Sequence, residues 1–311
     1  ILFFAILINN GLALNVAVSI KPLYSLVAMV TDGVNKPILI AKGTTSPHDI
    51  KLSAKTINQI KQANIVFIAS KNLEIPIYRA LEGQNNLYQM VDFKGLNLLE
   101  FTADKIIFKE DIKEHHHHDY HEDDHHHDEL SGTDFHIWLD PKNAQAILVN
   151  VANILSQKDP QNAAKYKANV IKYSKRLEDL DKSLKRTFAP YKKASFIFYH
   201  NGFAYLENRY GISSKGIIQT GDHAAGHFLS NTFSNKKLLK LGNFIKANKV
   251  ACVFLEPQFN DKVLLRYLQE NKINYSNLDP IGDKLVVSKD LYFNLLTKNA
   301  IAFKKCMQKM N

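Results

Sequence analysis

Short apolar runs alternate with segments of helical period along the first half of the chain. The apolar runs cover residues 15–20, 36–41 and 64–69. Segments of helical period follow each of them, over residues 22–31, 53–63 and 75–81. Strands that alternate with helices favour a parallel sheet with crossover helices. The pattern therefore predicts an N-terminal α/β lobe, which we assign to residues 14–155.

The alternation restarts after residue 190. Further apolar runs, each followed by a helical candidate, lie at residues 195–200, 216–220, 250–256 and 273–279. We expect a second α/β lobe over residues 189–311. The predicted fold class is thus α/β, with two lobes that each contain a mainly parallel sheet flanked by helices.

A long amphipathic segment separates the two lobes. Asp159 and Pro160 are typical of a helix N-cap and of the first helical position. Apolar side chains then recur at steps of three and four, at Tyr166, Val170, Tyr173, Leu177, Leu180 and Leu184. A helix from Pro160 to Phe188 would extend about 43 Å. We therefore expect one rigid connecting helix within residues 156–188 rather than a flexible linker.

The N-terminus has the composition of a secretory signal that lacks its basic start. Eight apolar residues open the chain, and Gly11 and Ala13 supply the small residues that a signal peptidase needs. This apolar run is too short to span a bilayer. We predict that residues 1–13 are a truncated signal peptide and that the mature chain begins near Leu14 or Asn15. No cysteine lies near Ala13 to carry a lipid, so an exported soluble protein is expected.

The composition fits a globular protein with a basic surface. The chain has 311 residues, of which 45% are hydrophobic, and this is enough to form sizeable buried cores. Its formal net charge of +10 would permit nucleic-acid binding if the cations were clustered. The lysines of the connecting segment are instead spread over its faces, at Lys165, Lys167, Lys172, Lys175, Lys182 and Lys185. We predict a solvated surface and no nucleic-acid site.

The chain contains two cysteines. Cys252 lies in an apolar run and Cys306 lies in the last helix-like segment. In an exported protein an even number of cysteines favours a disulfide, which would contribute about 4 kcal/mol for a loop of this length. Two buried thiols that never meet are the alternative.

The histidines divide into one dense run and five isolated positions. Within residues 114–129, eight of the thirteen histidines are mixed with acidic residues: His115, His116, His117, His118, His121, His125, His126 and His127. The isolated positions are His48, His136, His200, His223 and His227.

Three isolated histidines lie where α/β proteins place ligands. His200 ends an apolar run, His48 lies in the loop after another, and His136 follows the histidine-rich run. Asp279 ends the last apolar run. Three imidazoles and one carboxylate would suit tetrahedral Zn(II). Spacing alone does not join these residues, because each histidine could be a hydrogen-bonded core residue and Asp279 could start a turn.

Five segments of the chain resemble, in order, the metal-specific solute-binding proteins of ABC transporters. They are GTTSPHDIKLSAKTINQIKQANIVFIAS, FHIWLDPKNA, FIFYHNGFAYLENRYGI, ACVFLEPQF and LDPIGD. The resemblance runs from about residue 15 to the C-terminus and is strongest to the zinc-binding ZnuA type. It implies His48, His136 and His200 as ligands of Zn(II), with Asp279 completing the site.

The same resemblance implies a fold, a partner and a location. Members have two α/β lobes joined by a long helix, an acidic histidine-rich loop before the second ligand, and a cysteine pair that matches Cys252 and Cys306. They act in the periplasm, capture the metal between the lobes, and deliver it to the membrane subunit of an ABC permease with a cytoplasmic ATPase. The protein is accordingly expected to be a monomer that catalyses no reaction.

The chain departs from the family pattern at its first ligand. Some zinc-binding members have a glutamate just before the first histidine, whereas Pro47 occupies that position here. The fourth ligand would then be Asp279 or water. Manganese-binding members usually have a glutamate at the position of His200, so histidine there favours zinc.

Several other residues have two possible roles. Asp49 and Glu256 could orient the imidazole rings, or be an ordinary turn residue and strand end. His223 and His227, four apart, could form an accessory metal site or be surface histidines. The histidine-rich run could gather or sense zinc by weak, fast exchange. An acidic spacer and an engineered tag are the alternatives for that run.

Three other functions are compatible with this sequence. A manganese or iron transport component would have the same fold. A zinc hydrolase would use the three histidines as ligands and Glu256 as a general base. A surface adhesin of this fold would lack a permease partner.

Overall fold

The computed structural model describes residues 14–42, 46–101, 104–108, 132–219, 233–259 and 261–308. The predicted signal peptide, the histidine-rich run, His223 and His227 lie outside these residues. No helix among the described residues combines the length and apolar character needed to cross a bilayer.

The first lobe is built on a four-stranded parallel sheet. Its strands are β1 (Val16–Val18), β2 (Ile38–Leu39), β3 (Ile65–Ile68) and β4 (Leu87–Gln89), in the order β2-β1-β3-β4. Helix α1 (Lys21–Val30) lies between β1 and β2 in the chain, α2 (Ala54–Lys61) between β2 and β3, and α3 (Ile75–Ala80) between β3 and β4. The predicted strands are confirmed for β1, β2 and β3. The sequence pattern missed β4, which is short and ends in a glutamine.

The second lobe repeats this arrangement. Its strands are β5 (Phe196–His200), β6 (Gly216–Gln219), β7 (Cys252–Leu255) and β8 (Tyr275–Asn277), in the parallel order β6-β5-β7-β8. Its helices are α7 (Ala204–Tyr210), α8 (Asn235–Ala247), α9 (Lys262–Glu270) and α10 (Leu291–Met307). The four predicted strands and the α/β fold class are confirmed. Because the strands in each lobe are parallel, the carboxyl ends of the two central strands lie at the same edge of the sheet. This is the edge at which α/β proteins bind ligands.

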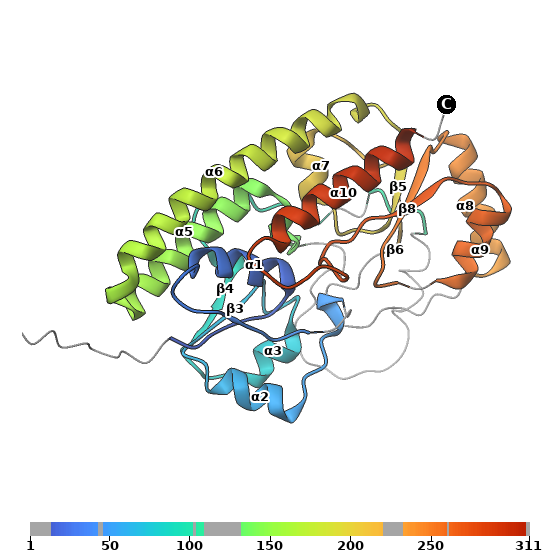
Figure 1. Ribbon diagram of the computed structural model, residues 1–311. Helices are drawn as coiled ribbons and strands as arrows, with labels where there is room; N and C mark the ends of the chain where they lie inside the picture. The colour runs from blue at the N-terminus through green and yellow to red at the C-terminus, as the bar shows by residue number, and fades with distance from the viewer. Residues whose placement is uncertain are drawn as a thin grey trace, which may run out of the picture.

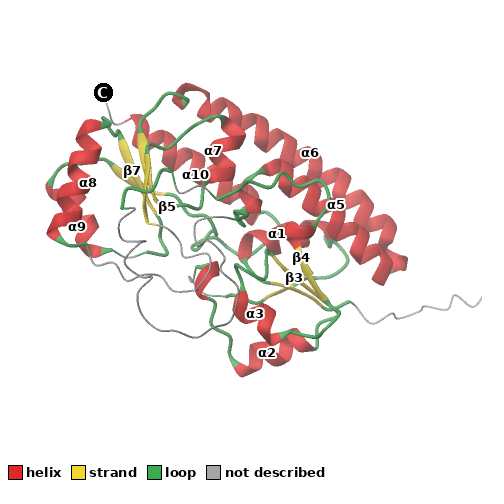
Figure 2. Cartoon of the chain, turned by 180° about the vertical axis from the view of Figure 1, so that it is seen from behind, coloured by secondary structure: helices red, strands yellow, loops and turns green. Residues whose placement is uncertain are grey.

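Long helices cover one side of the molecule (Figure 1). Helix α5 (Pro141–Lys158) is followed by α6 (Ala163–Phe188), and α10 lies beside α6 along the same side of the molecule (Figure 1, Figure 2). Helix α6 has 26 residues and would extend about 39 Å, so the predicted connecting helix is present. It begins three residues later than expected because residues Pro160–Asn162 form a 3-10 turn. Instead of capping the helix, the Asp159 carboxylate accepts a hydrogen bond from the Tyr166 hydroxyl at 2.6 Å.

Polar contacts fasten the second lobe to the first. Lys289 Nζ lies 2.6 Å from Asp32 Oδ1 at the end of α1. The Trp138 indole donates to the carbonyl of Pro280 at 2.8 Å, and the Tyr292 hydroxyl donates to the carbonyl of Trp138 at 2.7 Å. A single buried apolar cluster also extends through both lobes. The two lobes are therefore held against each other by side chains as well as by α6.

The two cysteines form a disulfide between β7 and α10. Cys252 and Cys306 are both buried, and their Cα atoms lie 6.0 Å apart. This confirms the predicted pairing and excludes the alternative of two separate thiols. The bond closes a loop with a sequence separation of 54 residues. It ties the last helix to the centre of the second sheet.

Candidate metal centre

The three isolated histidines named above come from different parts of the fold. His48 lies on the 3-10 turn Pro47–Asp49, which follows β2 and begins where Ser46 Oγ accepts the His48 backbone N–H. His136 precedes the 3-10 turn Ile137–Leu139 that leads into α5. His200 is the last residue of β5. His48 and His200 therefore lie after or at the end of a strand, whereas His136 lies in the first lobe just before α5.

The structure brings these three side chains together at the boundary between the lobes. Their ring centroids are 5.7 Å apart for His48 and His136, 5.5 Å for His48 and His200, and 5.3 Å for His136 and His200. One nitrogen from each ring lies within 4.8 Å of the others. Nitrogens bound to one tetrahedral zinc lie about 3.3 Å apart. The group therefore needs only a small contraction to surround a single cation.

All three rings are withdrawn from solvent. The exposed fractions are 7% for His48, 1% for His136 and 2% for His200. Burial lowers the pKa of His200 to about 3, and the neighbouring His136 contributes in the same direction. His200 is consequently neutral near pH 7, which is the form that binds a metal.

Asp134 orients the second histidine. Its Oδ1 atom lies 2.8 Å from His136 Nδ1 and also accepts the His136 backbone N–H at 2.8 Å. Asp134 itself is fully buried. A carboxylate that accepts a hydrogen bond from Nδ1–H leaves Nε2 as the ligand atom. Asp134 was not predicted from the sequence, although its position two residues before a candidate ligand was a usable signal.

Glu256 lies behind the third histidine. Its Oε1 atom is 3.2 Å from His200 Nδ1, and both side chains are 2% exposed. Burial raises the pKa of Glu256 to about 8, and the proximity of Asp279 adds to this rise. Because the same burial lowers the pKa of His200, the pair is neutral rather than ionic near pH 7. Glu256 is therefore placed where it can orient the His200 ring.

Glycine is required beside the rings. A Cβ atom at Gly202 would lie 2.9 Å from His200 Nδ1 and 3.4 Å from His136 Nε2. Any larger residue would displace His200. This position, two residues after the third histidine, was not predicted from the sequence.

The structure does not bring Asp279 into the three-histidine group. Its Oδ1 atom accepts hydrogen bonds from Gln258 Nε2 at 2.9 Å and from the backbone N–H groups of Ile281 and Gly282. Its Oδ2 atom accepts the backbone N–H of Asp283 at 2.6 Å. The carboxylate thus stabilises the turn after β8 in this structure. Asp49 is exposed on the turn that carries His48.

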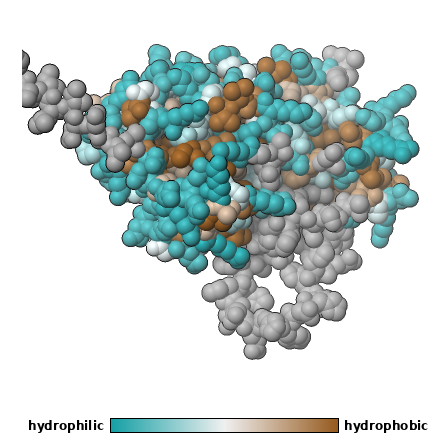
Figure 3. Space-filling model, turned by 60° about the horizontal axis from the view of Figure 1, so that its bottom comes forward, coloured by the Kyte–Doolittle hydropathy of each residue, from teal (hydrophilic) through white to brown (hydrophobic). Residues whose placement is uncertain are grey.

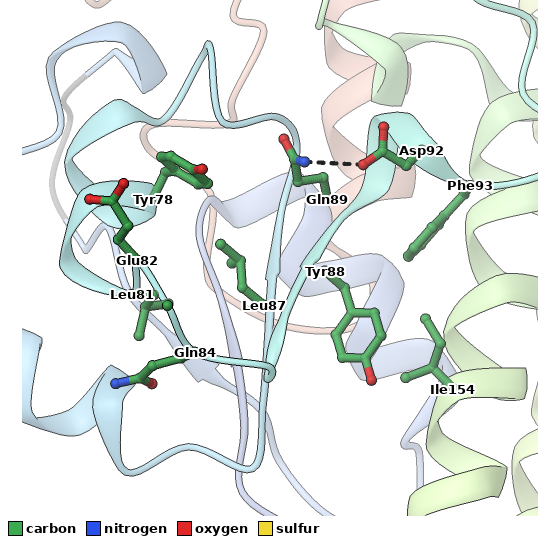
Figure 4. A pocket seen from close by; sticks show the side chains of 11 residues that line it. Tyr78, Leu81, Glu82, Gln84, Leu87, Tyr88, Gln89, Asp92, Phe93 and Ile154 are labelled. Atoms are coloured by element: carbon green, nitrogen blue, oxygen red, sulfur yellow. Dashed lines mark hydrogen bonds between the residues drawn. The ribbon is translucent and has the colours of Figure 1, made fainter.

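A separate cavity of about 470 Å³ lies at the outer edge of the first sheet. Figure 4 shows Leu87 and Tyr88 of the edge strand β4 within it, with Tyr78 on one side and Phe93 on the other. None of the three histidines lines this cavity. It does not belong to the metal centre.

The comparisons with known proteins cover almost the whole chain. The family model "Zinc-uptake complex component A periplasmic" (ZnuA) matches residues 16–306. The high-affinity zinc uptake system protein ZnuA of Brucella suis biovar 1 (strain 1330) is 31% identical over 314 residues, covering 94% of this chain and 92% of that protein. The protein of the same name from Haemophilus ducreyi (strain 35000HP / ATCC 700724) is 29% identical over 295 residues, covering 94% and 93%.

Solved structures share the fold. A zinc-bound ZnuA with residues 138–173 of its own numbering deleted has a TM-score of 0.72 and 21% identity, covering 94% of this chain and 98% of that one. The solute-binding protein FpvC from Pseudomonas aeruginosa in complex with Mn²⁺ has a TM-score of 0.73 and 18% identity, covering 96% and 100%.

Proposed function

Because this chain belongs to the ZnuA family of periplasmic zinc-uptake components, we propose that His48, His136 and His200 hold Zn(II) at the boundary between its lobes. The chain is a binding component of a zinc-uptake system and is not an enzyme. The zinc hydrolase considered above therefore does not apply.

One observation carries the proposal: three buried imidazoles from both halves of the chain present nitrogens within 4.8 Å of one another. Imidazole is a borderline ligand that suits zinc, whereas manganese favours oxygen donors. Asp134 and Glu256 support the ring orientations from behind His136 and His200. The donor set thus favours zinc as the transported ion.

The fourth coordination position has two candidates, Asp279 and water. Asp279 can reach a metal only if it exchanges some of the hydrogen bonds that its carboxylate accepts from Gln258 and from the backbone of Ile281, Gly282 and Asp283. Substitution Asp279→Ala separates the two candidates. A large loss of zinc affinity supports Asp279 as a ligand, and an unchanged affinity supports water.

The triad is tested by zinc titration of single variants in competition with a chelator. His48→Ala, His136→Ala and His200→Ala should each lose the tightest site. Asp49→Ala changes the residue next to His48 on the same turn and is the matched control. A variant of the triad that keeps the affinity of the unchanged protein would contradict the proposal.

The metal preference is tested by His200→Glu. A glutamate at this strand end replaces a nitrogen donor by an oxygen donor, which should shift the preference from zinc towards manganese. Competition between the two metals under equal conditions measures the shift. This experiment also addresses the manganese-binding alternative, since the Mn²⁺-bound FpvC structure has the same fold.

The proposed partner is the membrane subunit of an ABC permease with its cytoplasmic ATPase, to which a monomer of this chain delivers zinc. Membership of the family supports this partner. Reconstituted permease that hydrolyses ATP faster with the zinc-loaded chain would support it, and the triad variants should lack the effect. An adhesin without a permease partner would give no stimulation.

The histidine-rich run is proposed to bind additional zinc weakly. Its imidazoles and carboxylates offer many interchangeable donor sets. Deletion of residues 115–127 should reduce the number of weakly bound ions and leave the tight site intact. An unchanged stoichiometry would support the acidic spacer instead.

A further inference from the structure

Helix α8 exposes several lysines. Lys236, Lys240 and Lys246 are exposed, while Leu241 and Ile245 on the opposite side are buried in the core. Residues 233–249 contain five lysines, and no acidic residue occurs among them. This helix therefore lacks the mixed charges that are usual on a solvated helix face.

The two lysines at the start of α8 do not stabilise the helix through its dipole. Lys236 and Lys237 lie in the first turn of α8, which has no acidic residue. Cations at a helix N-terminus oppose the helix dipole. Lys237 Nζ and Lys240 Nζ lie 5.8 Å and 5.7 Å from the centre of the Phe108 ring, so both contact a side chain of the protein itself. Lys236, which opposes the dipole at this helix start, therefore suggests a role other than helix stability.

Helix α9 extends the same surface. It packs against α8 where the Tyr267 hydroxyl occupies the space beside Gly242, and the two helices lie together at the outer end of the second lobe (Figure 1). Lys262 and Arg266 are exposed on it. Its two carboxylates have local roles: Asp261 caps the helix, and Glu270 binds Arg266 at 2.7 Å.

Apolar side chains are exposed among these cations. Leu239 on α8 is 67% exposed and Val263 on α9 is 43% exposed. At this end of the molecule, apolar surface lies between stretches of hydrophilic surface (Figure 3). Residues 189–311 also carry 18 basic against eight acidic residues, an excess equal to the formal net charge of +10 of the whole chain. The second lobe is thus the basic end of the protein.

We propose that the surface formed by α8 and α9 binds the anionic headgroups of a phospholipid membrane. Exposed lysines attract an anionic lipid surface, and isolated apolar side chains between them can enter the headgroup region. Each lysine near such a surface increases partitioning about fivefold, which corresponds to about 1 kcal/mol. Two adjacent helices with several cations and two exposed apolar residues suit an extended lipid surface. Such binding would keep the zinc carrier close to the membrane that holds its transporter.

The experiment is co-sedimentation of the metal-free full chain with vesicles. The anionic vesicles contain equal parts of phosphatidylglycerol and phosphatidylcholine, and the neutral vesicles contain phosphatidylcholine alone. We expect binding to the anionic vesicles at low salt. It should be lost in about 1 M salt, where the Debye length is about 3 Å. Failure to bind the anionic vesicles at low salt, or equal binding to both kinds, would overturn the proposal.

Two variants of equal charge locate the surface. Lys236→Glu, Lys246→Glu and Lys262→Glu together should weaken binding on the order of 100-fold. The matched control places the same three charge reversals on exposed lysines of α6: Lys167→Glu, Lys175→Glu and Lys182→Glu. This control should retain most of the binding. Equal losses in the two variants would mean that binding follows net charge alone, and would overturn the assignment to α8 and α9.

A third variant tests the apolar contribution. Leu239→Asn leaves the charge unchanged and should weaken vesicle binding several-fold. Zinc binding and thermal unfolding, measured for every variant, should stay unchanged because these side chains are exposed and distant in sequence from the triad. A surface that recognises an acidic protein through charge alone would leave vesicle binding insensitive to Leu239→Asn, and that result would also refute the proposal.

Discussion

The contact between Asp134 and His136 allows a quantitative prediction for zinc affinity. Asp134 Oδ1 meets both the Nδ1 atom and the backbone N–H of His136 at 2.8 Å, and the carboxylate is fully buried. Loss of a carboxylate that orients a metal-binding histidine reduces metal affinity about 10- to 100-fold. This corresponds to about 1.4 to 2.7 kcal/mol. We expect Asp134→Ala to fall at the upper end of this range.

Asp134→Asn should have the smaller effect. The amide oxygen of asparagine can still accept a hydrogen bond from His136, whereas the negative charge beside the ring is lost. We expect a loss of about 10-fold. The difference in zinc affinity between the two variants separates the effect of ring orientation from that of charge. Asparagine removes only the charge, whereas alanine removes both the charge and the hydrogen bond that orients the ring.

The assay can use the single tryptophan of the chain. The centre of the Trp138 side chain lies 5.3 Å from that of His136, so its fluorescence should report occupancy of the triad. Titration in competition with a chelator gives the affinity, and thermal unfolding of the metal-free variants shows whether they fold. Asp49→Asn, an exposed carboxylate beside His48, is the control and should change the affinity less than twofold, by roughly the effect usual for a surface substitution. If folded Asp134→Ala bound zinc as tightly as the unchanged protein, the role assigned to Asp134 would be wrong.

Three further predictions concern other parts of the fold. Gly202→Ala should weaken zinc binding without unfolding the protein, because its Cβ would lie 2.9 Å from His200 Nδ1; the same competition titration measures the loss, and unaltered affinity would contradict it. Burial raises the pKa of Glu74 from 4.5 to about 7, so the folded protein binds the Glu74 proton more tightly than the unfolded chain does. The stability that this proton provides is fully present below pH 4.5 and decreases as the pH rises to about 7. Denaturant unfolding of metal-free protein should therefore show Glu74→Gln gaining roughly 3 kcal/mol relative to the unchanged protein between these pH values; a constant difference would refute the burial argument. Cys252→Ser should lose about 4 kcal/mol of unfolding free energy with the loss of its bond to Cys306, and reduction of the unchanged protein should lower its melting temperature in the same direction.

The central strands of both sheets were predictable because they are buried on both faces. Residues 64–69 and 195–200 are almost entirely apolar, and burial of every residue in β3 and β5 explains this composition. Strand β4 lies at an edge and is only half buried, so its sequence lacks such a run. Helix α5 was missed for another reason. It begins directly after the short apolar segment that follows His136, and the pattern there does not separate a strand from a helix.

The metal centre was predictable only in part. Sequence positions placed His48 and His200 at carboxyl ends of strands, but only the resemblance to a family joined them to His136. The resemblance does not settle the role of Asp279, since its carboxylate accepts hydrogen bonds from backbone N–H groups of a turn in the structure. Whether it binds the metal depends on competition between backbone N–H groups and a cation. That competition is a property of the folded loop and leaves no pattern in the sequence.

Zinc affinity in this fold should depend on residues far from the metal. His48 and His136 lie in the first lobe and His200 in the second, so the spacing of the three proposed ligands depends on the contacts that hold the lobes together. Trp138, two residues after His136, binds the carbonyl of Pro280 in the second lobe. Lys289 binds Asp32 at the end of α1. A metal that binds only the assembled triad stabilises these contacts, and by the same linkage any substitution that loosens them weakens zinc binding.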